Sequence, residues 1–65
     1  MKGKVSMYDK ENGFGFILGD NGIEYYTRFE GLSLEEKFKT EKGMSVIFDL
    51  QEGLRGDEAI NIKLL

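Results

Sequence analysis

The residues of this chain best suited to chemistry with a ligand are flat side chains at alternating positions. Phe14 and Phe16 form one such pair, and Tyr26 and Arg28 form a second. In a β-strand, side chains two residues apart lie on the same face of the sheet, so each pair shares a face. Every nucleobase has a π-face that can stack on a flat group, which contributes about 1–3 kcal/mol per base. If the two strands are neighbours, the spacing predicts a patch for stacking unpaired bases.

Phe14 and Phe16 have a second interpretation, because most phenylalanines in small domains belong to the core. Glycines alternate with them, however, and an ordinary core strand would have valine or isoleucine at those positions. Apolar residues also alternate along two later segments and supply an interior without these rings. The candidate core residues are Val5, Ile17, Leu32, Met44, Val46, Phe48, Leu50, Ile60, Ile62 and Leu64. We therefore predict that the remaining aromatic patch, Phe14, Phe16, Tyr26 and Phe29, is exposed and marks a binding site.

The composition excludes several function classes. The 65 residues make one domain, residues 1–65, and contain no cysteine and no histidine. Disulfides, thiol nucleophiles, ordinary zinc sites and histidine-based catalysis are therefore excluded, and we expect no metal, no cofactor and no enzyme activity. The carboxylate pairs Asp20/Glu24 and Glu35/Glu36 are more simply turn and surface residues. Without an apolar run long enough to span a bilayer, or a charged-then-apolar leader, we expect a cytoplasmic protein with no membrane partner.

The charge balance argues against a binder that relies on neutralising phosphates. Nine Lys and Arg against twelve Asp and Glu give a net charge of −3, whereas strongly electrostatic binders of duplex DNA are basic. A mechanism based on base stacking tolerates an acidic chain better than a mechanism based on neutralising phosphates does. The cations expected to border the aromatic patch are Lys4, Lys10, Arg28, Lys37, Lys39 and Arg55.

Short strand-like segments alternate with turn signals and must position these side chains. The five expected strands cover residues 2–8, 13–18, 24–29, 44–50 and 59–64. Asp20, Asn21 and Gly22 form a hairpin-turn signature, since Asn and Gly adopt positive φ at low cost. This turn makes the second and third strands antiparallel neighbours and brings the two flat pairs together. The pattern predicts an all-β fold and fits a small five-stranded barrel of the OB type better than a sandwich.

The connection over residues 31–43 is longer than the other turns. It contains a Ser-x-x-Glu capping box, and Leu34 and Phe38 lie four residues apart, so we expect one helical turn. Two positions stay open for Phe38: beneath the loop as a lid on the core, or outward as another base platform. Residues 53–56 are most simply the last hairpin turn, with Arg55 a solvated side chain and secondarily a phosphate contact.

Over essentially its whole length the chain resembles a bacterial cold-shock protein, the single-domain form of the cold-shock OB fold. The matching segments follow the family's order: residues 3–5, 13–17, 25–29, 38–40, 43–48, 52–56 and 59–61. Residues 13–17 match the family's first RNA-binding motif, and residues 25–29 are a divergent second motif. The resemblance implies a five-stranded antiparallel OB-fold barrel that binds single-stranded RNA or DNA through stacked bases and acts as an RNA chaperone or antiterminator.

The resemblance also implies which residues contact the strand. By matching position, the base platforms would be Phe14, Phe16, Tyr26, Phe29 and Phe38, with Tyr8 beside them. Arg28 stands where the family usually has a stacking histidine, and its planar guanidinium can stack on a base while adding charge. The full set of predicted nucleic-acid-binding residues is Lys4, Met7, Tyr8, Lys10, Phe14, Phe16, Tyr26, Arg28, Phe29, Phe38, Lys39 and Arg55.

Several departures from the family predict weaker binding. Met7 occupies the place of a stacking tryptophan, and Ser6 and Asn12 stand where lysines are typical. Together these changes should weaken binding by about 2–4 kcal/mol and flatten its salt dependence. Tyr25 and Thr27 lie where the family has core-facing valines, so we expect either strained packing or a hydrogen-bond partner for the Tyr25 hydroxyl.

A second hypothesis from another class therefore stays open. In it, the cold-shock fold serves as a protein-interaction or dimerising module, and a partner covers the aromatic patch. The acidic balance and the lost tryptophan and lysine positions favour this alternative. For the nucleic-acid-binding form we expect a monomer, and the sequence leaves a dimer open.

Overall fold

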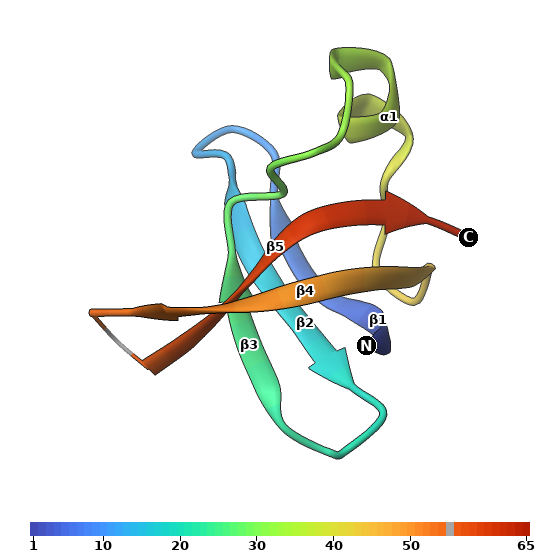
Figure 1. Ribbon diagram of the computed structural model, residues 1–65. Helices are drawn as coiled ribbons and strands as arrows, with labels where there is room; N and C mark the ends of the chain where they lie inside the picture. Colours follow the sequence, from blue (N-terminus) through green and yellow to red (C-terminus); the bar gives the residue numbers. More distant parts are fainter. Residues whose placement is uncertain (55) are drawn as a thin grey trace.

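The computed structural model describes residues 1–54 and 56–65, which form a closed β-barrel (Figure 1). Its elements are β1 (Lys2–Asp9), β2 (Phe14–Gly19), β3 (Glu24–Thr27), α1 (Leu34–Lys39), β4 (Ser45–Gly53) and β5 (Gly56–Leu64). The strands follow the order β1–β2–β3–β5–β4, and β4 pairs again with β1. This confirms the predicted five-stranded OB-type barrel, with the addition that β3 and β5 pair in parallel while the other neighbours are antiparallel.

The β2–β3 hairpin forms where the turn signature predicts it. Gly22 has a φ of 82°, and its amide donates a hydrogen bond to the Gly19 carbonyl oxygen at 2.9 Å. The hairpin pairs Phe16 with Tyr26 directly across the two strands. The two flat pairs recognised in the sequence are therefore neighbours on one sheet.

Nine apolar residues form the core of the described chain. They are Val5, Ile17, Tyr25, Phe29, Leu32, Val46, Phe48, Ala59 and Ile62. Most of the aliphatic core prediction is confirmed, but Leu50 is 38% exposed. The register between β4 and β5 shifts between Ile47 and Asp49, where two residues of β5, 61 and 62, lie opposite one residue of β4. Such a bulge changes which side chains of β5 face inward beyond it, so that Ala59 is buried and Ile60 is not. Half-buried positions are occupied by Met44, Ile60 and Leu64.

The prediction of an exposed Phe29 is wrong, because its side chain is 0% exposed. Alternation along β3 places Tyr26 outward and Tyr25 and Thr27 inward, and Phe29 falls on the inward face as well. Beyond the end of β3, the Phe29 backbone turns with a φ of 57°, and its N–H donates to Thr27 Oγ1 at 2.9 Å. The ring is enclosed in the barrel and has no surface on which a base could stack.

Gly15 is required by the packing of Phe29. A Cβ atom at Gly15 would overlap the Met7 carbonyl oxygen and lie 2.8 Å from Phe29 Cε2. Only a residue without a side chain leaves room for the ring and the neighbouring strand. The glycine between the two phenylalanines of β2 therefore has a packing role inside the barrel.

The two polar side chains that face inward from β3 both have partners. The Tyr25 hydroxyl accepts a hydrogen bond from Asn21 Nδ2 at 2.7 Å, which confirms the predicted need for a partner. Thr27 Oγ1 donates to the Ala59 carbonyl oxygen at 2.9 Å and thus connects β3 to β5. Because buried polar groups are costly when unpaired, these bonds allow Tyr25 and Thr27 to occupy core positions.

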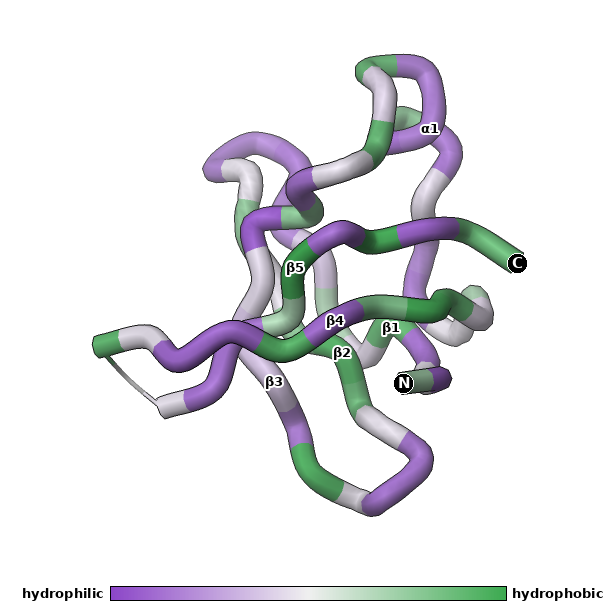
Figure 2. Tube along the Cα trace, viewed as in Figure 1, coloured by the Kyte–Doolittle hydropathy of each residue, from purple (hydrophilic) through white to green (hydrophobic). Residues whose placement is uncertain are grey.

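α1 lies outside the barrel, toward the end at which the β1–β2 turn is found (Figure 1). Its six residues make slightly more than the single turn expected, and none of them is buried. The β1–β2 turn is largely hydrophilic and α1 is mixed, as Figure 2 shows. The helix therefore adds little to the core and is placed to form part of a surface site.

Candidate nucleic-acid interface

Aromatic side chains of β2 and β3 gather on the outer surface of the barrel. The ring centroids of Phe14 and Phe16 each lie 6.0 Å from that of Tyr26, with interplanar angles of 24° and 73°. Met7 on β1 is paired with Phe16 and adds its thioether to the row. The three rings are half-buried, so part of each remains open to solvent. We call Met7, Phe14, Phe16 and Tyr26 the aromatic face.

Arg28 extends the aromatic face just beyond the end of β3. Its side chain is exposed, and Nη1 donates a hydrogen bond to the Tyr26 hydroxyl oxygen at 3.3 Å. This bond places a permanent positive charge and a flat group beside the tyrosine ring. Arg28 also lines two surface hollows, which have no other lining residue in common.

The first hollow, of about 270 Å³, lies between the β1–β2 turn and α1. Its lining residues are Tyr8, Lys10, Gly13, Arg28, Leu34, Lys37 and Phe38. Phe38 is 82% exposed, so of the two positions left open by the sequence it takes the outward one. Leu34, 86% exposed, was not among the predicted binding residues, although its spacing from Phe38 places both on one side of a helix. We call this site the α1 hollow.

Tyr8 connects the α1 hollow to the core. Its ring centroid lies 4.0 Å from that of Phe29, with an interplanar angle of 33°. Burial raises the pKa of the Tyr8 hydroxyl above its ordinary value, so the group stays protonated and neutral at physiological pH. Phe29 therefore supports the site from beneath, through Tyr8, instead of meeting a ligand itself.

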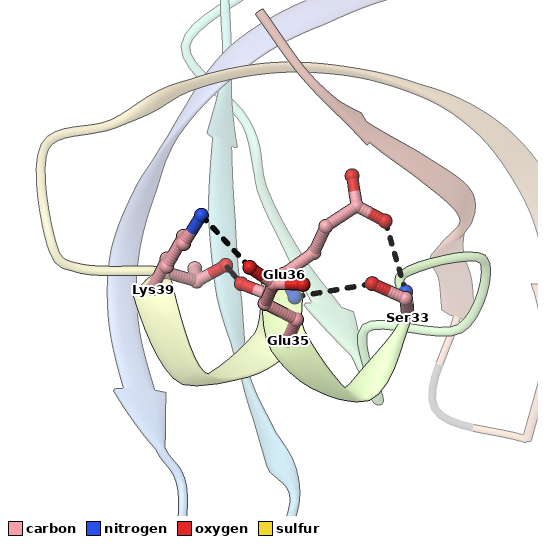
Figure 3. Close-up of polar contacts among 5 residues, drawn as sticks. Ser33, Glu35, Glu36 and Lys39 are labelled. Atoms are coloured by element: carbon pink, nitrogen blue, oxygen red, sulfur yellow. Dashed lines mark hydrogen bonds and ion pairs between the residues drawn. The ribbon is translucent and has the colours of Figure 1, made fainter.

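α1 is held in shape by contacts within and next to itself (Figure 3). Ser33 caps its start: Ser33 Oγ accepts from the Glu36 N–H at 3.1 Å, and Glu36 Oε1 accepts from the Ser33 N–H at 2.9 Å. At the other end, Thr40 Oγ1 donates to the Glu36 carbonyl oxygen at 2.8 Å. The predicted capping box is confirmed, and it orders the short helix that presents Phe38.

The predicted cations have different surroundings. Lys39 Nζ lies 3.2 Å from Glu35 Oε1 in an exposed ion pair, which contributes only about 0–1 kcal/mol and leaves the lysine able to exchange partners. Lys4 is exposed on β1, opposite Leu18, farther along the outer surface of the barrel. Lys10 Nζ donates to the Phe38 carbonyl oxygen at 2.6 Å. Arg55 lies outside the described residues.

The second hollow, of about 260 Å³, is lined by Tyr26, Arg28, Leu54 and Glu58. Leu54 and Glu58 were not predicted as site residues. Glu58 is paired with Tyr26 across β3 and β5, which no local pattern could reveal because the two residues are far apart in sequence. The hollow thus combines an aromatic ring, a fully exposed leucine, a cation and an anion.

Other surface features are separate from the aromatic face. A hollow of about 380 Å³ is lined by Met1, Gly31, Ile47, Phe48, Asp49, Asn61, Ile62 and Lys63. Within residues 1–54 and 56–65, no group of His, Cys, Asp or Glu side chains is arranged to hold a metal ion. The part of the chain that the structure describes also contains no helix of the length and apolarity needed to cross a membrane.

Comparison with known proteins identifies the fold family. A family model described as the "Cold-shock" DNA-binding domain matches residues 1–65. The chain belongs to the cold-shock domain family. The major cold shock protein of Streptococcus pyogenes serotype M1 is 42% identical over 65 residues, which cover 98% of this chain and 96% of that protein. A cold shock-like protein of Thermotoga maritima is 38% identical over 66 residues, covering 100% and 98%, and cold shock-like protein CspC of Bacillus cereus is 34% identical over 62 residues, covering 95% of each.

Cold-shock domains generally bind single-stranded nucleic acid. The resemblance implies lysines at two positions that hold Ser6 and Asn12 in this chain, and both side chains have local partners. Ser6, at a position of a typical lysine, donates to the Phe16 carbonyl oxygen at 3.1 Å. Asn12, at a second such position, binds the Asp9 carboxylate through its backbone N–H at 3.1 Å and through Nδ2 at 2.8 Å. The Asn12 side chain, and then its backbone N–H, lower the pKa of Asp9 below its ordinary value. Both positions therefore serve local structure and carry no positive charge.

Proposed function

We propose that this cold-shock domain binds single-stranded RNA or DNA by stacking unpaired bases on the aromatic face, in an RNA-chaperone or antiterminator type of role. The observation that carries this proposal is the set of half-exposed rings, in which Phe14 and Phe16 each lie 6.0 Å from Tyr26, together with the two hollows that Arg28 lines. Exposed rings arranged in this way suit bases regardless of their sequence. Because the proposed ligands are transcripts, we expect the protein to act in the cytoplasm.

The proposed mechanism needs no chemical step on the ligand. Bases from an unpaired strand stack over Phe14, Phe16 and Tyr26, and a further base reaches Phe38 across the α1 hollow. Lys4, Arg28 and Lys39 then lie near the phosphates. Bases held in this way are unavailable for pairing, so the protein opposes hairpin formation, and duplexes bind poorly because their bases are hidden.

A titration of labelled oligothymidine at two salt concentrations tests the proposal. Phe16→Ala should weaken binding by about 1–3 kcal/mol, the contribution of one stacked base. Ile23→Ala is the matched control, because Ile23 is 53% exposed in the β2–β3 turn and lines neither hollow next to Arg28. Equal affinity of the two variants, or tighter binding of a duplex than of the single strand, would contradict base stacking on this face.

The alternative of a protein-interaction or dimerising module predicts a different outcome of the same experiment. If the aromatic face is normally covered by a partner, the wild-type protein will bind no oligonucleotide even at low ionic strength. Sedimentation of the free protein then separates a self-associating module from one that needs another protein. For the nucleic-acid binder we expect a monomer in this measurement.

A further inference from the structure

Lys10 connects two parts of the molecule that are distant in sequence. Its Nζ donates to the carbonyl oxygen of Phe38, 28 residues away, at 2.6 Å. The same ammonium lies 5.6 Å from the centroid of the Phe38 ring and 6.0 Å from that of Tyr8, within the range of cation–π attraction. One charge at the β1–β2 turn therefore contacts both the last turn of α1 and a ring on β1.

The residues of α1 itself contribute little burial to holding the helix in this position. None of its residues is buried, and the capping box and the Glu35–Lys39 ion pair are internal to the helix and its cap. Among the hydrogen bonds found in the described residues, the one from Lys10 reaches the helix from the β1–β2 side of the α1 hollow. Buried Leu32 and Thr40 anchor the chain on either side of α1, and the Lys10 contact adds a bond to the helix turn that carries the exposed Phe38.

We propose that Lys10 is a positioning residue, which holds Phe38 and α1 opposite Tyr8 so that the α1 hollow is preformed for a single base. This inference rests on the proposed function. Pockets for drug-sized ligands have about 300–1,000 Å³, so a hollow of about 270 Å³ suits a group of the size of one base. Holding the loop in its bound conformation before binding lowers the ordering cost of association.

The salt dependence of oligothymidine binding separates positioning from a phosphate contact. Lys10→Met keeps most of the apolar stem of the side chain and removes its charge. We expect its affinity for oligothymidine to be about two- to fivefold lower. The slope of log affinity against log salt concentration (the salt slope) should stay unchanged. Lys4→Met is the matched control, since Lys4 is an exposed lysine elsewhere on β1, and it should lower the slope by about 0.7. A slope reduced by about 0.7 in Lys10→Met would overturn the proposal, because it would place Lys10 on a phosphate.

A double-mutant cycle tests whether Lys10 acts through Phe38. Phe38→Ala alone should weaken binding by at least about fivefold. In that background, Lys10→Met should cause little further loss, because the ring that Lys10 positions is absent. Lys10→Arg should restore most of the affinity in the presence of Phe38, since it keeps a cation and donors. If Lys10→Met lowers the oligonucleotide affinity of Phe38→Ala as much as it lowers that of the wild type, the proposal is contradicted.

Hydrogen exchange of the nucleic-acid-free protein supplies a readout that does not require binding. The α1 amides of Lys10→Met should exchange about two- to fivefold faster than in the wild type, while the barrel amides keep their rates. Unchanged α1 exchange would overturn the positioning role, even in a protein that binds oligonucleotide well. If the wild type binds no oligonucleotide, the proposed function fails, and the exchange rates still decide whether Lys10 orders α1.

Discussion

The hairpin of β2 and β3 carries aromatic rings on both of its faces, and the two faces differ in what surrounds them. On the inner side, Tyr25 and Phe29 are at most 5% exposed, and the Tyr25 hydroxyl is hydrogen-bonded to Asn21. On the outer side, Phe14 and Phe16 are half-buried and lie against Tyr26. One short hairpin therefore supplies both a core and an exposed aromatic surface, and the position of a ring along the strand decides between them.

The largest expected effect compares one ring from each side. Phe29→Ala removes a fully buried ring, and we expect it to destabilise the fold by about 3–5 kcal/mol. Phe16→Ala should change stability much less and reduce oligonucleotide affinity instead. Urea denaturation of both variants measures the difference. If Phe29→Ala does not fold, the milder Phe29→Leu should still be less stable than Phe16→Ala, and equal losses would show that Phe16 also belongs to the core.

Thr27→Val tests how the boundary between the two faces is fixed. The substitution keeps the shape of the side chain but removes the bond to the Ala59 carbonyl oxygen and the acceptor for the Phe29 N–H. We expect a loss of about 1–3 kcal/mol in urea denaturation, because buried backbone groups lose their partners. Thr27→Ser retains the hydroxyl and serves as the control. If Thr27→Ser loses more stability than Thr27→Val, the methyl group of Thr27, and not its hydrogen bonds, stabilises this turn.

Local patterns in the sequence predict most of the fold and part of the site. Strand alternation, the Asp20–Gly22 turn and the capping box at Ser33 are all encoded by residues close together in sequence, and each forms as expected. Phe29 was misplaced because it was grouped with Tyr26 as an aromatic residue, whereas period-two alternation assigns it to the opposite face.

The parts of the site that the sequence did not predict depend on distant contacts. The Lys10 bond to Phe38 joins residues 28 apart, and Glu58 reaches Tyr26 through the parallel β3–β5 pair. The bulge that buries Ala59 instead of Ile60 likewise depends on the register between β4 and β5. Such features follow from closure of the barrel, which no segment of the chain specifies alone.

A smaller effect is expected outside the core, at the start of α1. Ser33→Ala removes the acceptor for the Glu36 N–H and should destabilise the helix by about 0.5–2 kcal/mol. Because α1 has no buried residue, the loss should appear as faster hydrogen exchange in α1, with little change in the melting temperature of the barrel. Ser45→Ala, an exposed serine at the start of β4, is the control. A melting temperature as low as that of Thr27→Val would show that α1 is part of the cooperative core.

The smallest expected effect concerns the pH dependence of the β1–β2 turn. Hydrogen bonds from the Asn12 side chain and backbone lower the folded-state pKa of Asp9 below its unfolded value. The stability that these bonds contribute is therefore fully present above the unfolded pKa of about 3.9 and is lost as the pH falls through the lower folded value. Since Asp9 bonds to a neutral amide at an exposed turn, the contribution is small and insensitive to salt.

Asn12→Ala isolates this contribution, because it removes the side-chain donor and leaves Asp9 in place. The stability difference between wild type and Asn12→Ala, measured by urea denaturation, should be constant near neutral pH and shrink once the pH falls below about 3.9. A difference that instead grows in acid would mean that Asn12 favours the protonated carboxyl group. Asn12→Lys, which introduces the lysine that the resemblance implies at this position, completes the test: it should steepen the dependence of oligonucleotide affinity on salt concentration, with a change of about 0.7 in the slope of log affinity against log salt concentration.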